Sequence, residues 1–314
     1  MKITLDISKL VEEGKLTREE ADKLTALAAH DTGSLGINIL IGFGVVATAA
    51  GAVALVPTPL TAVSLGLALF AAGCAIVLNR VQQWILLGQI CLVIGALMFG
   101  GGVIAYGAGS LASMLIVTAA FALAAIAARS SLLMALAVLA ASACLGARTG
   151  YSHALYSLAI FEPTLTVVLF SALALIAYQA SQRLPADYER LAITAARTSL
   201  LLINFGFWIG SLWGDPLMLL RSMNAKDASL DKTVIPATVF SILWAVVLLG
   251  AGIWAVQVNR RWLVNLVALF AGIHFYTQWF ERLGATPLSV LLGGVVMLAS
   301  AFALWMFNRR VVDA

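Results

Sequence analysis

Four polar side chains recur at helical spacing within one apolar stretch near the end of the chain. Thr277 and Gln278 lie three and four residues after His274, and Glu281 lies seven residues after it, so at about 100° per residue the four share one face of a helix. Histidine changes charge near neutral pH without assistance, and Gln278 could bridge His274 to Glu281. A buried histidine that hydrogen-bonds a neighbouring helix is the more frequent case for such a residue; the functional hypothesis is a substrate or proton site.

A second polar stripe lies between residues 190 and 211. Arg190, Arg197, Asn204 and Ser211 recur at seven-residue intervals, which also places them on one helical face. Arg197 would lie about 10 Å beyond Arg190, inside the hydrocarbon if the helix enters the membrane at Arg190. If the hydrocarbon begins near Thr198, the Arg197 side chain instead reaches back to the headgroups, and we favour this interpretation. Arg197 and Asn204 join the hypothetical substrate or proton path.

Glu162 is the remaining carboxylate of that hypothetical path. It precedes Pro163, a residue suited to the first turn of a helix, so we expect Glu162 on the outer surface beside a helix start. The aromatic segment before it is expected to lie along the outer membrane interface, and contains Tyr151, His153 and Tyr156. The stretch 214–234 has balanced charge and is expected to be a solvated loop; its charged residues are Asp215, Arg221, Lys226, Asp227, Asp231 and Lys232.

The composition indicates which elements carry these residues. Of 314 residues, 62% are hydrophobic and 11% are charged, whereas about a quarter of the residues in soluble domains are charged. The net charge of +4 comes from basic residues spread over short connections, which does not predict nucleic-acid binding. The three cysteines lie in apolar runs without metal-ligand spacing, so we expect no metal site or disulfide. The predicted class is an all-α, polytopic helical membrane protein.

Ten apolar runs predict ten transmembrane helices. They cover residues 36–56, 59–79, 84–106, 109–128, 131–147, 160–179, 192–213, 235–257, 262–280 and 286–308. The run at 131–147 is short and could be partly re-entrant. Within the transmembrane domain, residues 35–310, two halves at 36–147 and 160–308 could be related by inverted topology, as in many transporters. Residue similarity between the halves does not establish that repeat.

The hydrophilic residues 1–34 predict two short amphipathic helices that form a hairpin. Asp6 can cap the first helix, and Thr17 with Glu20 forms a capping box at the start of the second. With the N-terminus inside, thirteen of the Lys and Arg residues lie on the cytoplasmic side and five lie outside. This bias predicts that both termini are cytoplasmic. The hairpin could pack on the membrane surface or on a protein partner.

Glycines recur every seven residues in the third apolar run, at Gly88, Gly95, Gly102 and Gly109. Small residues at this spacing let a second helix approach closely. The consecutive residues Gly100, Gly101 and Gly102 each lose about 1 kcal/mol of helix propensity relative to alanine, so a local helix break is the alternative. We favour close packing.

Several stretches together resemble one family of bacterial membrane proteins. They are the N-terminal segment 7–24, Gly95-Ala-Leu-Met-Phe-Gly-Gly-Gly, Ala128-Arg-Ser-Ser-Leu-Leu, Arg260-Arg-Trp-Leu-Val-Asn-Leu, the aromatic turn at 274–283 and a closing helix with Gly-Gly. This arrangement is similar to the predicted membrane proteins of Domain of Unknown Function 2157. The resemblance implies this membrane architecture and a bacterial inner membrane, and it implies no activity.

Two classes of function compete on these residues. A transporter or permease-like protein for a small solute would account for ten helices and intramembrane polar stripes, because such residues are costly and usually functional. A membrane-embedded enzyme or lipid-handling protein would use a polar pocket on the outer side. In a structural scaffold, both polar stripes would pack against neighbouring helices without access to water. Catalytic signatures and cofactor-binding motifs are absent from the sequence. We therefore expect transport rather than catalysis, without a cofactor.

Overall fold

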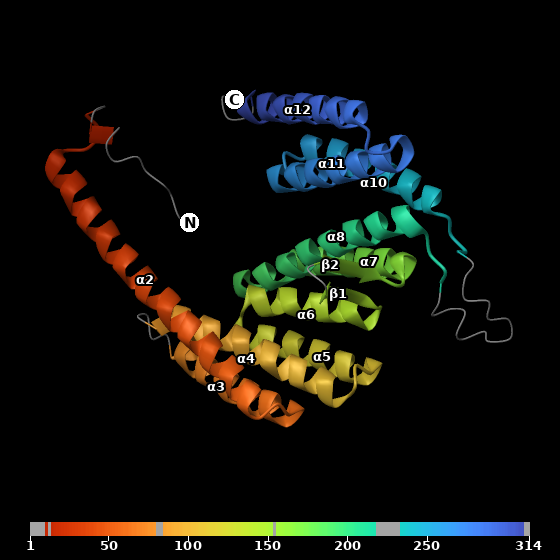
Figure 1. Cartoon of the computed structure of the whole chain (residues 1–314). Helices are drawn as coiled ribbons and strands as arrows, with labels where there is room; N and C mark the ends of the chain where they lie inside the picture. The colour runs from red at the N-terminus through yellow and green to blue at the C-terminus, as the bar shows by residue number, and fades with distance from the viewer. Residues whose placement is uncertain (1–9, 12–13, 80–83, 153–154, 218–232, 311–314) are drawn as a thin grey trace. The chain divides into compact units, whose positions relative to one another are not determined.

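The structure is a computed structural model that describes residues 10–11, 14–79, 84–152, 155–217 and 233–310. Its elements (Figure 1) are α2 (Arg18–Leu55), α3 (Pro59–Leu78), α4 (Ile85–Tyr106), α5 (Leu111–Ala128), α6 (Ser131–Cys144), β1 (Ala147–Ser152), β2 (Leu155–Ile160), α7 (Pro163–Ser181), α8 (Ala186–Trp213), α10 (Ala237–Gln257), α11 (Arg261–Leu283) and α12 (Pro287–Arg310). The chain divides into two compact units, Met1–Ala137 and Val138–Ala314, and α6 crosses the division.

Seven of the described helices are long and apolar enough to cross a membrane: α3, α4, α5, α7, α8, α10 and α11. Shorter apolar helices cover Leu40–Leu55, Ser131–Cys144 and Pro287–Phe302. Each of these stretches coincides with a predicted apolar segment, although α8 begins at Ala186 rather than at residue 192. These helices are those of an integral membrane protein, and the predicted total of ten spanning helices stays a prediction.

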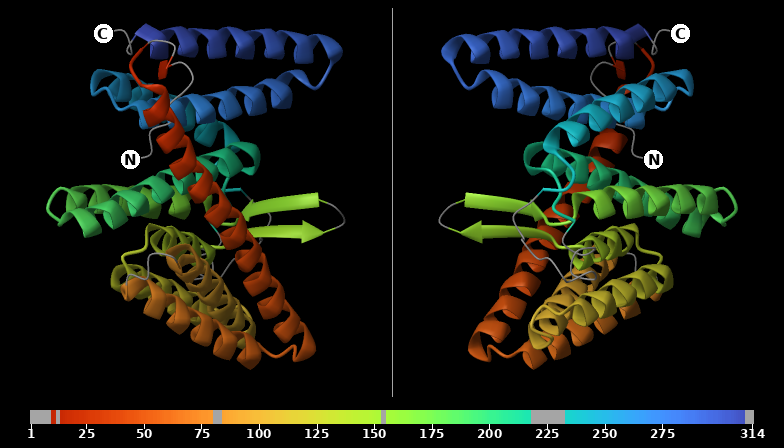
Figure 2. Two further views of the ribbon diagram at one scale, coloured as in Figure 1. Left: turned by 90° about the vertical axis from the view of Figure 1, so that its left-hand side faces the viewer. Right: turned by 90° about the vertical axis from the view of Figure 1, so that its right-hand side faces the viewer.

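Helix α2 is one unbroken helix of 38 residues (Figure 2). Its start confirms the predicted capping box: the Glu20 backbone N–H donates to Thr17 Oγ1 at 3.3 Å, and the Thr17 backbone N–H donates to Glu20 Oε2 at 2.9 Å. The prediction of a separate short helix before the first membrane segment is wrong, because the two form one helix; a boundary between a cytoplasmic segment and the membrane domain near residue 35 stays a prediction. No proline interrupts this stretch, and the helix continues through Gly33 and Gly36. The predicted first helix lies largely outside the described residues.

Helices α3 and α4 approach each other closely at paired glycines. A Cβ added at Gly95 would lie 2.5 Å from the Phe70 backbone nitrogen, and one added at Gly66 would lie 2.5 Å from the Phe99 nitrogen. Both contacts are to backbone, which cannot move aside without separating the helices. The seven-residue spacing of glycines thus marks the α3–α4 interface, as small residues do in membrane helix pairs.

The predicted alternative of a helix break at the glycine triplet is wrong. Helix α4 is continuous through Gly100, Gly101 and Gly102. A Cβ at Gly100 would lie 2.8 Å from the Phe121 ring of α5, and one at Gly102 would lie 2.8 Å from the Pro59 carbonyl oxygen of α3. Gly101 has open space around it. Close packing therefore accounts for the first and third glycines of the triplet.

In the second unit α7 packs along α8, and α10 contacts both α8 and α11. Strands β1 and β2 form an antiparallel hairpin in which Ala147 pairs with Ile160 and Ser152 with Leu155 (Figure 2). The sequence pattern predicts an aromatic segment along the membrane interface at this place and does not predict a hairpin. Pairing satisfies the backbone groups that such a segment would otherwise leave exposed. Residues 153 and 154, including His153, lie outside the described residues.

Candidate functional site

The polar faces of α8 and α11 meet at a tryptophan from α10. The Trp244 indole N–H donates to Asn204 Oδ1 of α8 at 3.0 Å. The same indole packs edge-to-face on the His274 ring of α11, with ring centroids 4.9 Å apart at 74°. Trp244 is fully buried. The structure therefore brings together two predicted site residues from different stripes, His274 and Asn204, through a residue that the sequence analysis did not identify.

Asn204 has hydrogen-bond partners at both ends of its amide. Besides accepting from Trp244, it donates from Nδ2 to the Leu200 carbonyl at 2.8 Å. Another polar member of the α8 stripe, Ser211, donates its hydroxyl hydrogen to the Trp208 carbonyl within the same helix. Side chains that bond to their own helix backbone need no outside partner. Two of the four residues of the α8 stripe, Asn204 and Ser211, thus have hydrogen-bond partners within the protein.

Aromatic contacts extend the α8–α11 interface on either side of Asn204. The Trp208 indole N–H donates to Thr277 Oγ1 at 3.0 Å. Phe205 and Phe270 make an edge-to-face contact with centroids 5.7 Å apart. Such ring pairs contribute about 0.5–1.5 kcal/mol beyond their buried area. These contacts hold the polar face of α11 against α8.

Two side-chain nitrogens on the polar face of α11 lack the hydrogen bonds that the neighbouring polar groups make. His274 Nδ1 and Gln278 Nε2 are buried and have no hydrogen-bond partner within the described part of the chain. A buried polar atom without a partner costs about 1–3 kcal/mol, and such atoms call for a structural or functional explanation. They are one helical turn apart, so one polar ligand could reach both. Glu281, one turn further along α11, is exposed.

Arg197 lies near the opposite end of the α8–α11 contact. Its side chain is exposed, and its guanidinium carbon is 4.8 Å from the centroid of the Trp262 ring. A cation–π contact of this kind contributes about 0.5–1 kcal/mol at exposed sites. Trp262 directly follows the Arg260-Arg261 pair in the first turn of α11, and tryptophan beside paired arginines is typical of a headgroup region. The contact supports the prediction that the Arg197 side chain reaches back to the headgroups. Arg197 therefore lies apart from His274, which packs on Trp244.

The prediction that Glu162 is an outer-surface residue is wrong: its exposed fraction is 5%. It is the N-cap residue of α7, but its side chain does not cap the helix. Asp215, which is 0% exposed, supplies the cap instead: its Oδ2 accepts from the Thr164 backbone N–H and its Oδ1 from the Leu217 N–H, both at 2.7 Å. Glu162 therefore belongs to the α7 start and not to the His274 cluster.

The prediction that the whole 214–234 stretch is solvated is also wrong at its first residues. Asp215 forms an isolated antiparallel bridge with Ile235, which joins the end of α8 to the residues before α10. The remaining charged residues of this stretch, Arg221, Lys226, Asp227, Asp231 and Lys232, lie outside the described residues. The sequence contains one indication of this role. Asp215 directly follows Gly214, the residue that ends α8, and aspartate at such a place commonly forms turns and accepts hydrogen bonds from nearby backbone N–H groups.

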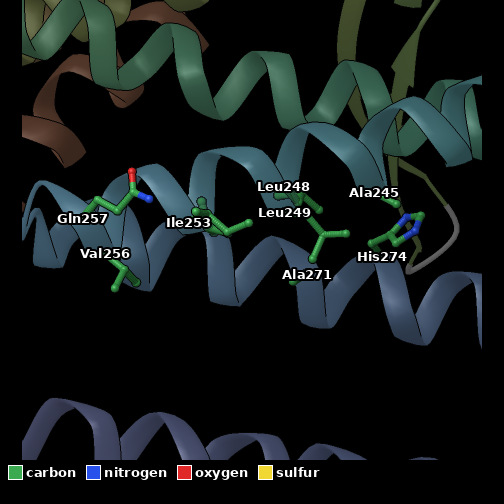
Figure 3. Close-up of a pocket in the computed structure, with 10 residues that line it drawn as sticks. Ala245, Leu248, Leu249, Ile253, Val256, Gln257, Ala271 and His274 are labelled. Carbon is green, nitrogen blue, oxygen red and sulfur yellow. The ribbon is translucent and has the colours of Figure 1, made fainter.

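A groove of about 620 Å³ lies between α10 and α11 (Figure 3). Its lining is aliphatic except for Gln257 at one end and His274 at the other. The groove follows the two helices and reaches the His274 ring on the side of α11 that faces α10. His274 is the predicted site residue that lines it. The surroundings of His274 are therefore aromatic on one side and aliphatic on the other.

Comparisons with protein-family models, with curated proteins and with solved structures find no match to this chain.

Proposed function

We propose that this protein is a transporter or permease-like protein for a small solute, and that His274 and Gln278 form its substrate or proton site. One observation carries the proposal: two buried nitrogens on one turn of an apolar helix have no partner within the described residues. An ionisable side chain inside a membrane helix is costly and usually serves a solute or a proton. Asn204 and Trp244 then position the His274 ring.

The proposal includes a membrane arrangement. Ten helices span the bacterial inner membrane, with both termini in the cytoplasm and residues 1–34 on the cytoplasmic side, where a protein partner could bind. The excess of basic residues in the predicted cytoplasmic connections supports this orientation. Membership in the Domain of Unknown Function 2157 family is part of the same proposal and rests on the stretches quoted above.

A structural scaffold is the second candidate, and the satisfied amide of Asn204 favours it. Both ends of that side chain are used in helix–helix or intrahelical hydrogen bonds. Dry packing of this kind needs no solute. The two candidates differ on His274: a transporter requires its imidazole, whereas a scaffold requires only the volume of the ring.

Uptake into proteoliposomes distinguishes the candidates. The purified full chain is reconstituted with a pH-sensitive dye inside, and a panel of anionic, cationic and neutral small solutes is added outside. We expect one solute class to produce uptake or proton movement in the wild type and in Gln182→Ala, a control at an exposed glutamine. The signal should be lost in His274→Ala and in the ring-retaining His274→Phe. Equal signals in all four proteins would remove His274 from transport, and no signal from any folded protein would favour the scaffold.

A further inference from the structure

We propose that the groove between α10 and α11 binds one acyl chain of an anionic phospholipid, whose phosphate lies at Arg260 and Arg261. This inference does not depend on transport, because it concerns a lipid held by the protein and not a solute moved by it. It rests on the lining, the length and the charge of the groove.

The lining of the groove suits a hydrocarbon chain. Leu249, Ile253 and Val256 present exposed aliphatic side chains along α10, with exposed fractions of 68%, 61% and 45%. Ala271 is the exposed residue opposite them on α11 (Figure 3). An apolar groove offers no hydrogen bonds to water, and cavities of this kind stay dry. In a membrane helix pair, the apolar molecule available to fill it is a lipid tail.

The length of the groove matches one leaflet of a bilayer. Its lining on α10 extends from Ala245 to Gln257, which is about 18 Å of helix. Half of the hydrocarbon core of a bilayer is about 15 Å thick. On α11, His274 lies about 20 Å from Arg261 by the same helical rise. A chain that starts at the Gln257 end would therefore terminate near the His274 ring.

Two arginines, Arg260 and Arg261, give the Gln257 end of the groove a positive charge. Gln257 is the last residue of α10, and α11 begins at Arg261. Asn259 has a φ of +53°, the left-handed conformation that closes this short connection. Arg260 and Arg261 are both exposed there. Arginine binds phosphate through several donors at once, so the charge favours an anionic headgroup over a zwitterionic one.

A helix of a second protein copy fits the groove less well. A helix with its side chains is about 10 Å wide. A single extended chain is much narrower than a helix. We therefore assign the groove to a lipid tail and keep a protein copy as an outcome of the test.

Native mass spectrometry of the full chain, released from nanodiscs that contain equal phosphatidylglycerol and phosphatidylcholine, tests the proposal. Ala271→Leu fills the groove from an exposed position. Its matched control is Gly250→Leu, at an exposed α10 residue that has open space around it and does not line the groove. We expect the wild type and Gly250→Leu to retain phosphatidylglycerol and Ala271→Leu to lose it.

The charge is tested separately with Arg260→Gln/Arg261→Gln, against the control pair Arg183→Gln/Arg190→Gln, of which Arg183 lies between α7 and α8 and Arg190 near the start of α8. One basic residue near an anionic membrane surface changes binding by about fivefold. The first pair should therefore reduce the preference for phosphatidylglycerol by about fivefold per arginine, and the control pair should leave it unchanged. Equal lipid retention in Ala271→Leu and Gly250→Leu would overturn the acyl-chain site. So would a change in oligomeric mass in Ala271→Leu with unchanged lipid, because the groove would then be a protein interface.

Discussion

The indole N–H of Trp244 on α10 donates to Asn204 Oδ1 on α8 at 3.0 Å, 40 residues away in the chain. This hydrogen bond lies among apolar side chains, and Trp244 is 0% exposed. It joins two helices and places the indole against His274. The contact therefore couples the stability of the second unit to the position of the histidine ring.

A double-mutant cycle with Asn204→Leu and Trp244→Phe measures this hydrogen bond. We expect a coupling of about 0.6–2 kcal/mol, the range measured for hydrogen bonds between membrane helices. The free energy of unfolding is followed in mixed micelles with increasing sodium dodecyl sulfate. Pairing Asn204→Leu with Trp254→Phe, at a half-exposed tryptophan elsewhere on α10, should give additive losses within about 0.5 kcal/mol. An additive Asn204–Trp244 pair would contradict the coupling.

Replacement of Gly95 by alanine should separate α3 from α4. The new Cβ would meet the Phe70 backbone nitrogen at 2.5 Å, and overpacking of this kind costs about 1–3 kcal/mol. Gly101→Ala is the matched control in the same helix, because Gly101 has open space around it. There the better helix propensity of alanine should leave stability unchanged or raise it by up to about 1 kcal/mol. Thermal unfolding in detergent compares the two, and similar melting temperatures would show that the glycine contact is not tight.

The buried cap of α7 predicts a large effect at Asp215. Asp215→Asn replaces one of two acceptor oxygens by an NH₂ group that faces a backbone N–H, and a buried donor left unsatisfied costs about 1–3 kcal/mol. Asp187→Asn, at an exposed residue in the first turn of α8, removes a charge that interacts favourably with the helix dipole and should cost about 0.3–1 kcal/mol. Hydrogen exchange at Thr164 should accelerate in Asp215→Asn only. If exchange at Thr164 is unchanged, Asp215 does not hold the helix start.

The capping box at the start of α2 predicts acid sensitivity. Hydrogen bonds from the Thr17 backbone and hydroxyl lower the pKa of Glu20 below its ordinary value of 4.5. Because the folded-state pKa is depressed, the carboxylate stabilises the helix start fully above pH 4.5, and that stabilisation is lost as the pH falls through the lowered pKa. Protection factors at Thr17, Glu20 and Ala21, whose backbone N–H groups are bonded at this helix start, should fall below pH 4.5 in the wild type once corrected for intrinsic exchange rates. Glu20→Gln keeps an acceptor but does not titrate, so a pH-dependent loss of equal size in this variant would contradict the role of the charge.

Reporter fusions test the predicted membrane orientation. A reporter joined after Ala108 and one joined after Asp227 should both report the outside, and one joined after Asn308 should report the cytoplasm. The physical reason is the excess of basic residues in the connections assigned to the cytoplasmic side. A cytoplasmic signal at Asp227 would contradict the ten-helix topology.

Local pattern was sufficient for the features that depend on one segment of chain. Apolar runs predicted the membrane helices because their length and composition are properties of contiguous residues. Thr17 and Glu20 predicted the capping box because both groups lie within one turn. The spacing of Gly88, Gly95 and Gly102 likewise predicted a close-packed face, although it did not identify α3 as the helix that occupies it.

The tertiary structure alone decided which residues meet across the chain. Trp244 reaches Asn204, Trp208 reaches Thr277, and Asp215 caps α7 at Thr164, with sequence separations of 40, 69 and 51 residues. Periodicity shows which face of a helix is polar, but it does not show which other helix covers that face. That choice depends on packing between helices, where many small contacts add up over distant segments. For this reason the sequence predicted His274 and Asn204 separately, and only the packing of α10 between α8 and α11 brings them together.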